Sequence, residues 1–370
     1  RDFSKGFDNI ENAITLKELR ITESEENLTK FYRQKFFPKL SSNLNRNVFL
    51  ENYYPRTDAA IALQDLYISS NKNELGSKHL LNDPKDGSLY SIAHANYHPI
   101  VRSYLDKFGY YDIFLIDAKT GNIVYSVYKE ADFATSLVDG PYAKTNFAKV
   151  FQFAKSAGRK SFVKLVDFEP YHPSYNAAAS FIASPIFEKD MLIGVAVFQM
   201  PIDIINSVMT SNQDWQASGM GASGETYMVG SDYTLRSESR FLIENPEQYL
   251  KLMRELSMDE KLVAEIKNAE SAIGRQRIRT EATERGLSGD SGVSIIKDYR
   301  DISVLSAFKP LKIADVEWAI MSEIDESEAF APINKLQETM LFIALISMAI
   351  AALVIIIFSR VYISSPINRM

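Results

Sequence analysis

Two histidines four residues apart are the first candidates for chemistry in this chain. His94 and His98 would share one face of a helix running through them, and two such imidazoles could bind zinc together with a third ligand. No third ligand lies near this pair in the sequence, and Pro99, which follows directly, could start a new helical turn. We therefore predict no metal site and no cofactor.

The sequence carries no motif for nucleophilic or phosphoryl-transfer chemistry. It contains neither a Gly-rich phosphate loop of the Walker type nor a Gly-x-Ser-x-Gly elbow. The absence of cysteine excludes disulfides, thiolate metal sites and cysteine nucleophiles. A group of acids near the C-terminal end is typical of the first turn of a solvated helix: Glu323, Asp325, Glu326 and Glu328. We predict that the chain is not an enzyme.

Composition indicates a folded chain of more than one unit. The 370 residues include 46% hydrophobic and 24% charged side chains, which argues against disorder. This length suits two or three folded units. The formal net charge of -6 argues against a nucleic acid as the main partner, because phosphate binding requires clustered Lys and Arg.

An apolar stretch from Met340 to Phe358 is the strongest signal in the sequence. As a helix it would span about 28 Å, close to the hydrocarbon thickness of a bilayer. Glu338 precedes it, whereas Arg360 and Arg369 follow it, and the positive-inside tendency places the C-terminus in the cytoplasm. Residues 1 to about 335 would then be periplasmic or otherwise extracytoplasmic, exported by a signal or a first helix upstream of residue 1. The lipid bilayer is therefore a predicted partner.

A seven-residue repeat marks the N-terminal region as a helix with a narrow apolar stripe. The repeat consists of Phe7, Ile14, Ile21 and Leu28, with Phe3 and Ile10 at the second seam position. Lys17 and Ser24 interrupt that second seam. We predict a homodimer with residues 3–28 at its interface; the alternative is that the stripe packs on the chain's own globular part.

Two stretches follow in which strand-like runs surround a helix. The first predicts strands at 110–118 and 122–129 around the turn Lys119-Thr120-Gly121, a helix at 145–157, and strands at 162–168, 177–187 and 192–200. The second predicts strands at 224–230 and 233–239, a helix at 247–268, and strands at 292–300, 303–311 and 317–324. Two strands, a helix and three strands thus occur twice, which indicates an α+β fold with two antiparallel-sheet units in tandem.

The expected organisation therefore has five parts. They are a long N-terminal helix (1–65), a membrane-distal unit (66–210), a membrane-proximal unit (211–328), a transmembrane helix (340–358) and a short following segment (359–370).

This order of elements resembles the double Cache sensors of bacterial transmembrane receptors, in which two PAS-like modules follow a long helix. The matching phrases are Gly109-Tyr-Tyr-Asp-Ile-Phe-Leu-Ile-Asp-Ala118, Ala183-Ser-Pro-Ile-Phe187, Gly194-Val-Ala-Val-Phe198 and Gly224-Glu-Thr-Tyr-Met-Val-Gly230. The final phrase, Ser365-Pro366-Ile367-Asn368-Arg369-Met370, is similar to the start of a HAMP signalling domain, where proline suits the first turn of a helix.

The resemblance implies that the membrane-distal unit binds a small molecule. The residues it implies for this site are Tyr125, Tyr128, Phe133, Tyr142, Phe168, Tyr171, His172, Tyr175, Asn176 and Gln199. Tyrosine offers a flat apolar face and one hydroxyl, which suits such a pocket. The alternative is that many of these aromatic residues belong to the core, since tyrosine is favoured in strands.

The family members best known to bind amino acids use an Arg-x-Trp-Tyr phrase for the carboxylate and two Asp residues for the ammonium. This sequence has no such phrase, and Gln199 and His172 stand where the resemblance places the acids. A buried ammonium without a carboxylate is costly. We therefore expect a ligand other than a common α-amino acid: a carboxylate, a neutral polar molecule or a modified amine. Asp167 or Glu169 could restore the site if their loop bends inward.

The resemblance implies a chemotaxis signal transducer in the cell inner membrane. The alternatives are the sensor of a histidine kinase or nucleotide cyclase, a membrane-anchored extracytoplasmic enzyme, and a sensor that docks a ligand-carrying periplasmic protein. In the sensor function, ligand binding would bias two conformations and shift the membrane helix.

Overall fold

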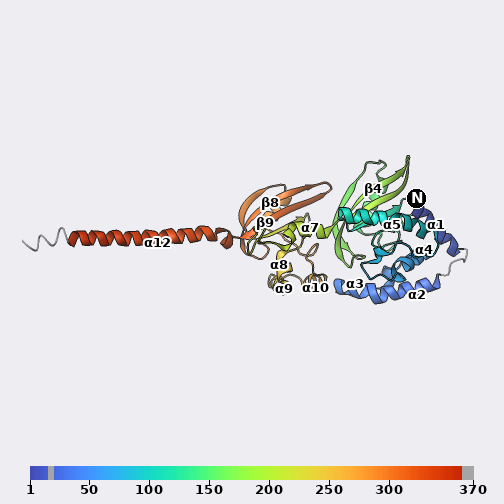
Figure 1. Ribbon diagram of the computed structural model, residues 1–370, viewed down its shortest axis with the longest axis horizontal. Helices are drawn as coiled ribbons and strands as arrows, with labels where there is room; N and C mark the ends of the chain where they lie inside the picture. The colour runs from blue at the N-terminus through green and yellow to red at the C-terminus, as the bar shows by residue number, and fades with distance from the viewer. Residues whose placement is uncertain (16–20, 361–370) are drawn as a thin grey trace, which may run out of the picture.

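The computed structural model describes residues 1–15 and 21–360. Two antiparallel sheets follow one another along the molecule, and the last helix extends away from them (Figure 1). This arrangement agrees with the coarse prediction of a mixed fold with two antiparallel sheets and a C-terminal apolar helix.

The first sheet has the strand order β2-β1-β5-β4-β3, with antiparallel neighbours throughout. Its elements are β1 (Asp112–Asp117), β2 (Ile123–Ser126), α6 (Asn146–Ser156), β3 (Lys164–Tyr171), β4 (Ala177–Glu188) and β5 (Met191–Gln199). The turn between β1 and β2 forms because Asp117 accepts hydrogen bonds from the next backbone N–H groups and Gly121 adopts a φ of 76°. The predicted strands and helix of this unit are present.

The N-terminal stripe is buried inside the chain's own fold. Helix α1 (Asp2–Thr15) packs on α5 (Leu89–Phe108) so closely that a Cβ on Gly6 would lie 2.7 Å from the Cα of Tyr90. Phe3, Phe7 and Ile10 are at most 6% exposed, and Leu28 is fully buried. The prediction that these residues form an interface between two chains is therefore wrong, because their side chains already fill this chain's core. Lys17 of the predicted seam lies outside the described residues.

The single long N-terminal helix is also not what the structure has. A second helix runs without interruption through α2 (Thr22–Phe31), η1 (Tyr32–Phe36) and α3 (Phe37–Leu44). It ends where Asn45 adopts a left-handed φ of 48°. Short helices follow: η2 (Leu50–Asn52), α4 (Asp58–Gln64), η3 (Asp65–Ser69) and η4 (Lys78–Leu80). They pack with α1, α5 and α2 beside the first sheet (Figure 1).

The second sheet has the strand order β6-β9-β8-β7. Its strands are β6 (Glu225–Gly230), β7 (Gly292–Lys297), β8 (Ser303–Ile313) and β9 (Val316–Asp325). The predicted strand at 233–239 is absent from the described chain; Thr234 and Leu235 form only isolated bridges. Tyr233, with a left-handed φ of 66°, lies in the turn after β6, and the chain then bonds back to β6 only at a few positions, such as Arg236 N to the Met228 carbonyl at 2.8 Å.

The helix predicted at 247–268 is split in two. It consists of α9 (Pro246–Glu255) and α10 (Glu260–Ala269). Ser257 has a φ of 63°, which ends the first helix, and the Asp259 side chain accepts hydrogen bonds from the first N–H groups of the second. Three further helices complete this part of the chain: α7 (Ile202–Met209), α8 (Arg240–Glu244) and α11 (Glu281–Leu287), with η5 (Ser211–Gln213) after α7.

Strand β3 joins the two units. Phe168 stacks on Trp318 of β9 with a ring-centroid distance of 5.8 Å, within an apolar cluster that spans both units. At the start of β3, the Lys164 ammonium lies 2.7 Å from the Asp315 carboxylate. A second contact joins α3 to α10, where the Asn268 side chain donates to the Ser42 carbonyl at 2.7 Å.

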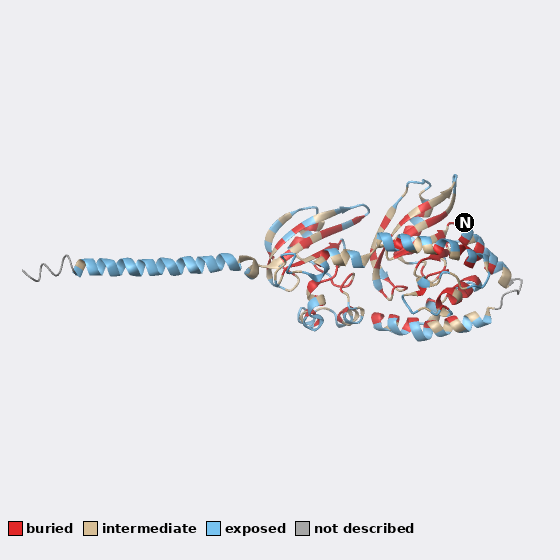
Figure 2. Cartoon of the chain, viewed as in Figure 1, coloured by how far each residue is buried: buried red, intermediate tan, exposed pale blue. Residues whose placement is uncertain are grey.

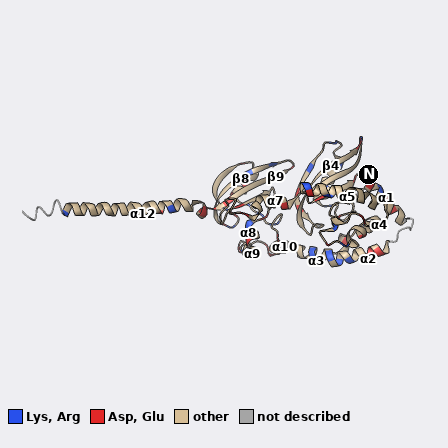
Figure 3. Ribbon diagram, viewed as in Figure 1, with Lys and Arg blue, Asp and Glu red and all other residues tan. Residues whose placement is uncertain are grey.

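Helix α12 (Glu326–Phe358) follows β9 directly. It is exposed from Ala331 to Phe358 (Figure 2), and no charged residue occurs between Glu338 and Arg360 (Figure 3). By length and composition, this helix could cross a membrane. The HAMP-like phrase at 365–370 lies outside the described residues.

Candidate ligand-binding site

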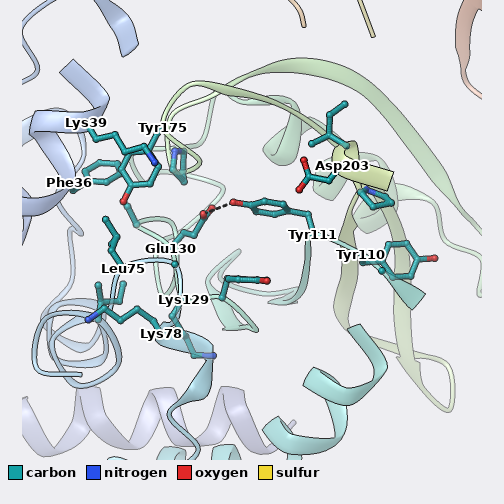
Figure 4. Close-up of a pocket in the computed structure, with 18 of the residues that line it drawn as sticks. Phe36, Lys39, Leu75, Lys78, Tyr110, Tyr111, Lys129, Glu130, Tyr175 and Asp203 are labelled. Atoms are coloured by element: carbon teal, nitrogen blue, oxygen red, sulfur yellow. Dashed lines mark hydrogen bonds between the residues drawn. The ribbon is translucent and has the colours of Figure 1, made fainter. Parts of the chain in front are cut away.

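A cavity of about 380 Å³ lies at one edge of the first sheet. Its walls come from the helix formed by α2, η1 and α3, from η3, and from η4 with the loop before it. The segment before β1, the turn after β2, the loop after β3 and the start of α7 complete them (Figure 4). The lining is mostly aromatic and aliphatic with a few charged groups: Phe31, Phe36, Lys39, Ile68, Leu75, Gly76, Lys78, Gly109, Tyr110, Tyr111, Tyr128, Lys129, Glu130, Ala131, Pro173, Tyr175, Pro201, Ile202, Asp203 and Ile204. This size and chemistry suit a small organic ligand.

The carboxylate of Glu130 is the best-positioned polar group of the cavity. It accepts hydrogen bonds from the Tyr111 hydroxyl at 3.0 Å, drawn in Figure 4, and from the Ser174 hydroxyl at 2.8 Å. Burial and the nearby Asp132 carboxylate raise the pKa of Glu130 to about 8. Glu130 is therefore largely protonated at neutral pH in the free protein.

Two further carboxylates lie buried behind Glu130. Asp132 accepts a hydrogen bond of 2.5 Å from Tyr171, and its Oδ1 is buried without a partner among the described residues. Burial raises the pKa of Asp132 to about 6. Asp112 accepts from the backbone N–H groups of Ile113 and Val127 at 2.6 and 2.8 Å, and its pKa is raised by burial and by Asp132.

The ammonium of Lys129 is directed into the aromatic core. Its Nζ donates to the carbonyl of Ser126 and lies 4.5 Å from the ring centroid of Tyr125 and 5.1 Å from that of Phe133. Neither ring lines the cavity. Burial lowers the pKa of Lys129, so this group is a weak counter-charge for the three acids.

Two other lysines, Lys78 and Lys39, also line the cavity, and neither is a hydrogen-bond partner of Glu130. Lys78 donates to the Asn71 carbonyl at 2.7 Å, and burial lowers its pKa. Lys39 is exposed on α3 and lies 4.5 Å from the ring centroid of Tyr175. Figure 4 shows Lys39 beside Tyr175 at the rim, opposite Asp203.

The structure brings two of the ten predicted site residues into the cavity, Tyr128 and Tyr175. Tyr125 and Phe133 face the core formed with α1 and α5, where the Tyr125 hydroxyl contacts His98 Nδ1 at 2.8 Å. Tyr142 and Tyr171 are buried in the core on the other face of the sheet. For Tyr125 and Tyr171, which lie in β2 and β3, the reason is strand geometry: alternate side chains point to opposite faces of the sheet, and the cavity lies at its edge.

The remaining four predicted residues lie outside the cavity. Phe168 packs between the two units, and His172 contacts the Tyr53 hydroxyl at 3.1 Å through Nδ1. Asn176 is buried, and its carbonyl accepts from Arg275 Nη2 at 2.6 Å. Gln199 is 3% exposed, and its Oε1 has no partner in the described chain.

Sequence reasoning missed Tyr111 and Glu130. A signal exists for Glu130, which stands in the charged run Lys-Glu-Ala-Asp shortly after the apolar strand β2. The expectation against a common α-amino acid rested on Gln199 and His172 standing where the two acids would be, and it did not include Glu130, an acid that lines the cavity. The cavity lining contains no arginine within the described residues, so a carboxylate would lack a bidentate partner.

The histidine pair has a structural role. His94 Nδ1 contacts the Asn82 carbonyl at 2.8 Å, and His98 Nε2 contacts the His79 carbonyl at 2.7 Å. Because carbonyls only accept, both rings carry their proton on those nitrogens. Burial and the charge of Lys129 lower the pKa of both imidazoles, that of His98 to about 3, so they are neutral. No group of three potential metal ligands was found in the described chain.

Comparison with known proteins gives structural neighbours only. No protein-family model matches the chain, and no curated protein matches it. The neighbours are sensory domains of chemoreceptors and histidine kinases, the class that the sequence resembles.

Three of these neighbours illustrate the range. The ligand-binding domain of the Pseudomonas aeruginosa amino acid chemoreceptor PctC with GABA is 13% identical over 68% of this chain and 87% of that one, with a TM-score of 0.37. The periplasmic sensory domain of the Campylobacter jejuni chemoreceptor Tlp1 is 13% identical over 84% of this chain and 95% of that one, with a TM-score of 0.39. The extracellular domain of the putative histidine kinase rpHK1S-Z16 is 10% identical over 62% of this chain and 76% of that one, with a TM-score of 0.38. At these values the similarities assign neither ligand nor activity to this chain.

Proposed function

We propose that the chain is the ligand-sensing region of a bacterial transmembrane receptor, with residues 1–328 extracytoplasmic. In this proposal the 66–210 unit binds a small molecule, the 211–328 unit transmits the change, and α12 carries it across the membrane to a cytoplasmic HAMP segment. The output domain would be a chemotaxis transducer, with a histidine kinase or cyclase as alternatives.

The observation that carries the proposal is the continuous connection from the cavity to α12. Strand β3 ends at Tyr171, which bonds to Asp132 behind the cavity. In the same strand, Asp167 accepts hydrogen bonds from Arg236 and from the indole N–H of Trp318. Trp318 belongs to β9, and the residue after β9 is the first of α12. A displacement of β3 therefore acts directly on the strand that leads into the membrane helix.

The junction between β9 and α12 is held firmly on several sides. The Glu328 carboxylate accepts from the backbone N–H groups of Ala222 and Ser223 at 2.7 and 2.8 Å. Arg300 donates to Asp325 at 2.6 Å. Charge-assisted hydrogen bonds fix the first turn of α12 to the second unit. A movement of that unit would therefore move α12 with it, because no flexible linker separates the two in the described chain.

A ligand can drive this change only by binding one conformation more tightly than another. Contact with the loop around Tyr175 would be such a differential contact in this proposal, because the backbone of this loop is hydrogen-bonded to two other elements. The Tyr175 carbonyl accepts from Asn43 of α3 at 2.7 Å, and the next carbonyl accepts from Arg275 of the second unit.

A distance measurement tests the proposal. The chain has no cysteine, so spin labels at Lys160→Cys and Gln337→Cys report the first unit and α12 without background. The 370-residue chain in nanodiscs would be screened by thermal shift against metabolites, and the label distance measured with each compound that binds. We expect a ligand-dependent change in that distance. A distance that stays the same with every saturating ligand would contradict the receptor function.

A further inference from the structure

The acidic groups in and behind the cavity outnumber the cations near them. Asp112, Glu130 and Asp132 are three carboxyl groups, and the buried ammonium of Lys129 interacts with Asp112. In a low-dielectric interior such an excess of acids must be reduced by protons or by an added cation. Glu130 is the member of this group that lines the cavity, so an incoming cation would reach it first.

The aromatic residues around Glu130 suit a cation. The rings of Tyr111 and Tyr128 are stacked with centroids 5.6 Å apart, and both line the cavity. Aromatic faces attract ammonium groups through their quadrupole, most strongly where water is excluded. Tyr111 also donates to Glu130, which fixes the carboxyl group beside this wall.

The other charged groups around Glu130 do not occupy this place. Asp112 and Asp132 lie behind it, and Lys129 points into the core. Lys39 lies on α3, and Lys78 is the first residue of η4. The remaining lining charge, Asp203 of α7, is exposed and also acidic.

We infer that the ligand is an organic cation with a primary ammonium and no α-carboxylate, and that this ammonium binds Glu130 in place of its proton. The inference rests on the proposed function. On binding, the carboxyl O–H bond of Glu130 breaks and the proton leaves to solvent, while the carboxylate accepts an N–H hydrogen bond from the intact ammonium. The absence of arginine from the described lining disfavours an α-carboxylate beside it.

Calorimetry of the 370-residue chain in nanodiscs tests this inference. The probes are butylamine, putrescine and tyramine, each beside its N-acetyl derivative, with tyrosine as the α-carboxylated counterpart of tyramine. Titration at pH 7 in phosphate and in HEPES, neither of which carries a primary ammonium, reveals proton release as a buffer-dependent heat. The variants are Glu130→Gln and, as a control at an exposed carboxylate outside the cavity, Glu169→Gln.

We expect at least one amine to bind, to lose tenfold to hundredfold in affinity on N-acetylation and in Glu130→Gln, and to release close to one proton. Glu169→Gln should bind as the wild type. Equal binding of an amine and its N-acetyl form would overturn the inference, and so would the absence of proton release when an amine binds the wild type. The proton-release measurement uses only the wild type, so it does not depend on whether Glu130→Gln folds. If no amine binds while neutral or anionic metabolites do, this inference fails and the proposed function stands. If no compound of any class binds, both fail.

Discussion

The Asp167 carboxylate is held by the Arg236 guanidinium through two parallel hydrogen bonds of 2.9 Å, from Nε to Oδ1 and from Nη2 to Oδ2. The Arg236 side chain is 2% exposed, and it also contacts Asp232 at 3.0 Å. This fork joins β3 of the first unit to the second unit, which makes it the most specific contact between them.

Breaking this fork should uncouple the units. Asp167→Asn removes the charge that pairs with a buried guanidinium, so we expect a loss of about 2 kcal/mol in unfolding free energy, the size typical of a charged hydrogen bond. Ligand affinity should change less than twofold, because Asp167 does not line the cavity. The ligand-dependent distance between labels at positions 160 and 337 should disappear.

The matched control for that variant is Asp139→Asn, an exposed carboxylate in the same unit. It should leave both stability and the label distances as in the wild type. An Asp167→Asn chain that still moves α12 on ligand binding would show that the signal takes another route.

The buried acids make stability depend on pH. Glu130 and Asp132 have pKa values raised to about 8 and about 6, so these two carboxyls bind more protons in the folded chain than in the unfolded chain between pH 4 and 8. Their contribution to stability therefore falls as pH rises through this range, whereas His94 and His98, whose pKa values burial lowers, contribute in the opposite direction. A variant isolates the carboxyl: the thermal midpoint of Asp132→Asn, relative to that of the wild type, should be higher at pH 8 than at pH 5. A relative midpoint that is the same at both pH values would show that Asp132 ionises in the folded chain without cost.

Substituting an aromatic residue that lines the cavity should weaken ligand binding, whereas substituting one that lies in the core should not. Tyr175→Ala removes a lining ring and should weaken a bound ligand roughly tenfold, whereas Tyr125→Phe should change affinity less than twofold. Calorimetry with any ligand found by the thermal-shift screen measures both. Ligand density confined to residues 219–325 would instead place the site in the second unit.

Local sequence patterns were sufficient for the strands of the first unit but not for its cavity. Alternating apolar residues and the turn at Gly121 depend on neighbours a few positions apart, and they correctly predicted β1 and β2. Glu130 acquires its environment from Tyr111 and Ser174, which are 19 and 44 positions away. Such contacts depend on which strand edge packs against which helix, and this packing cannot be predicted from the local pattern of a single sequence.

The N-terminal stripe shows the same limit. A seven-residue apolar repeat fits a pairing helix and a helix packed on its own domain equally well. The close approach of Gly6 to Tyr90 decides between them, since a helix this near to α5 buries its stripe against it.

That burial gives a prediction about chain association. Phe7→Ala should cost about 3–5 kcal/mol, because it empties a fully packed core position. Thermal or denaturant unfolding measures this directly. A cysteine at position 7 should not crosslink two chains, because this side chain lies in the core of its own chain. Efficient crosslinking there would show instead that position 7 lies between two chains.

The last prediction concerns the junction at the membrane. Glu328→Ala removes the acceptor for the N–H groups of Ala222 and Ser223 and for the Ser223 hydroxyl, which frees the first turn of α12 from the second unit. The cavity lies in the other unit, so ligand affinity should stay within twofold of the wild type. The ligand-induced change in label distance should shrink or vanish, because the strand and the helix no longer move as one body. Glu338→Ala, on the exposed part of the same helix, is the control and should preserve the change. If Glu328→Ala retains the full change, the backbone continuity of β9 and α12 alone transmits the signal.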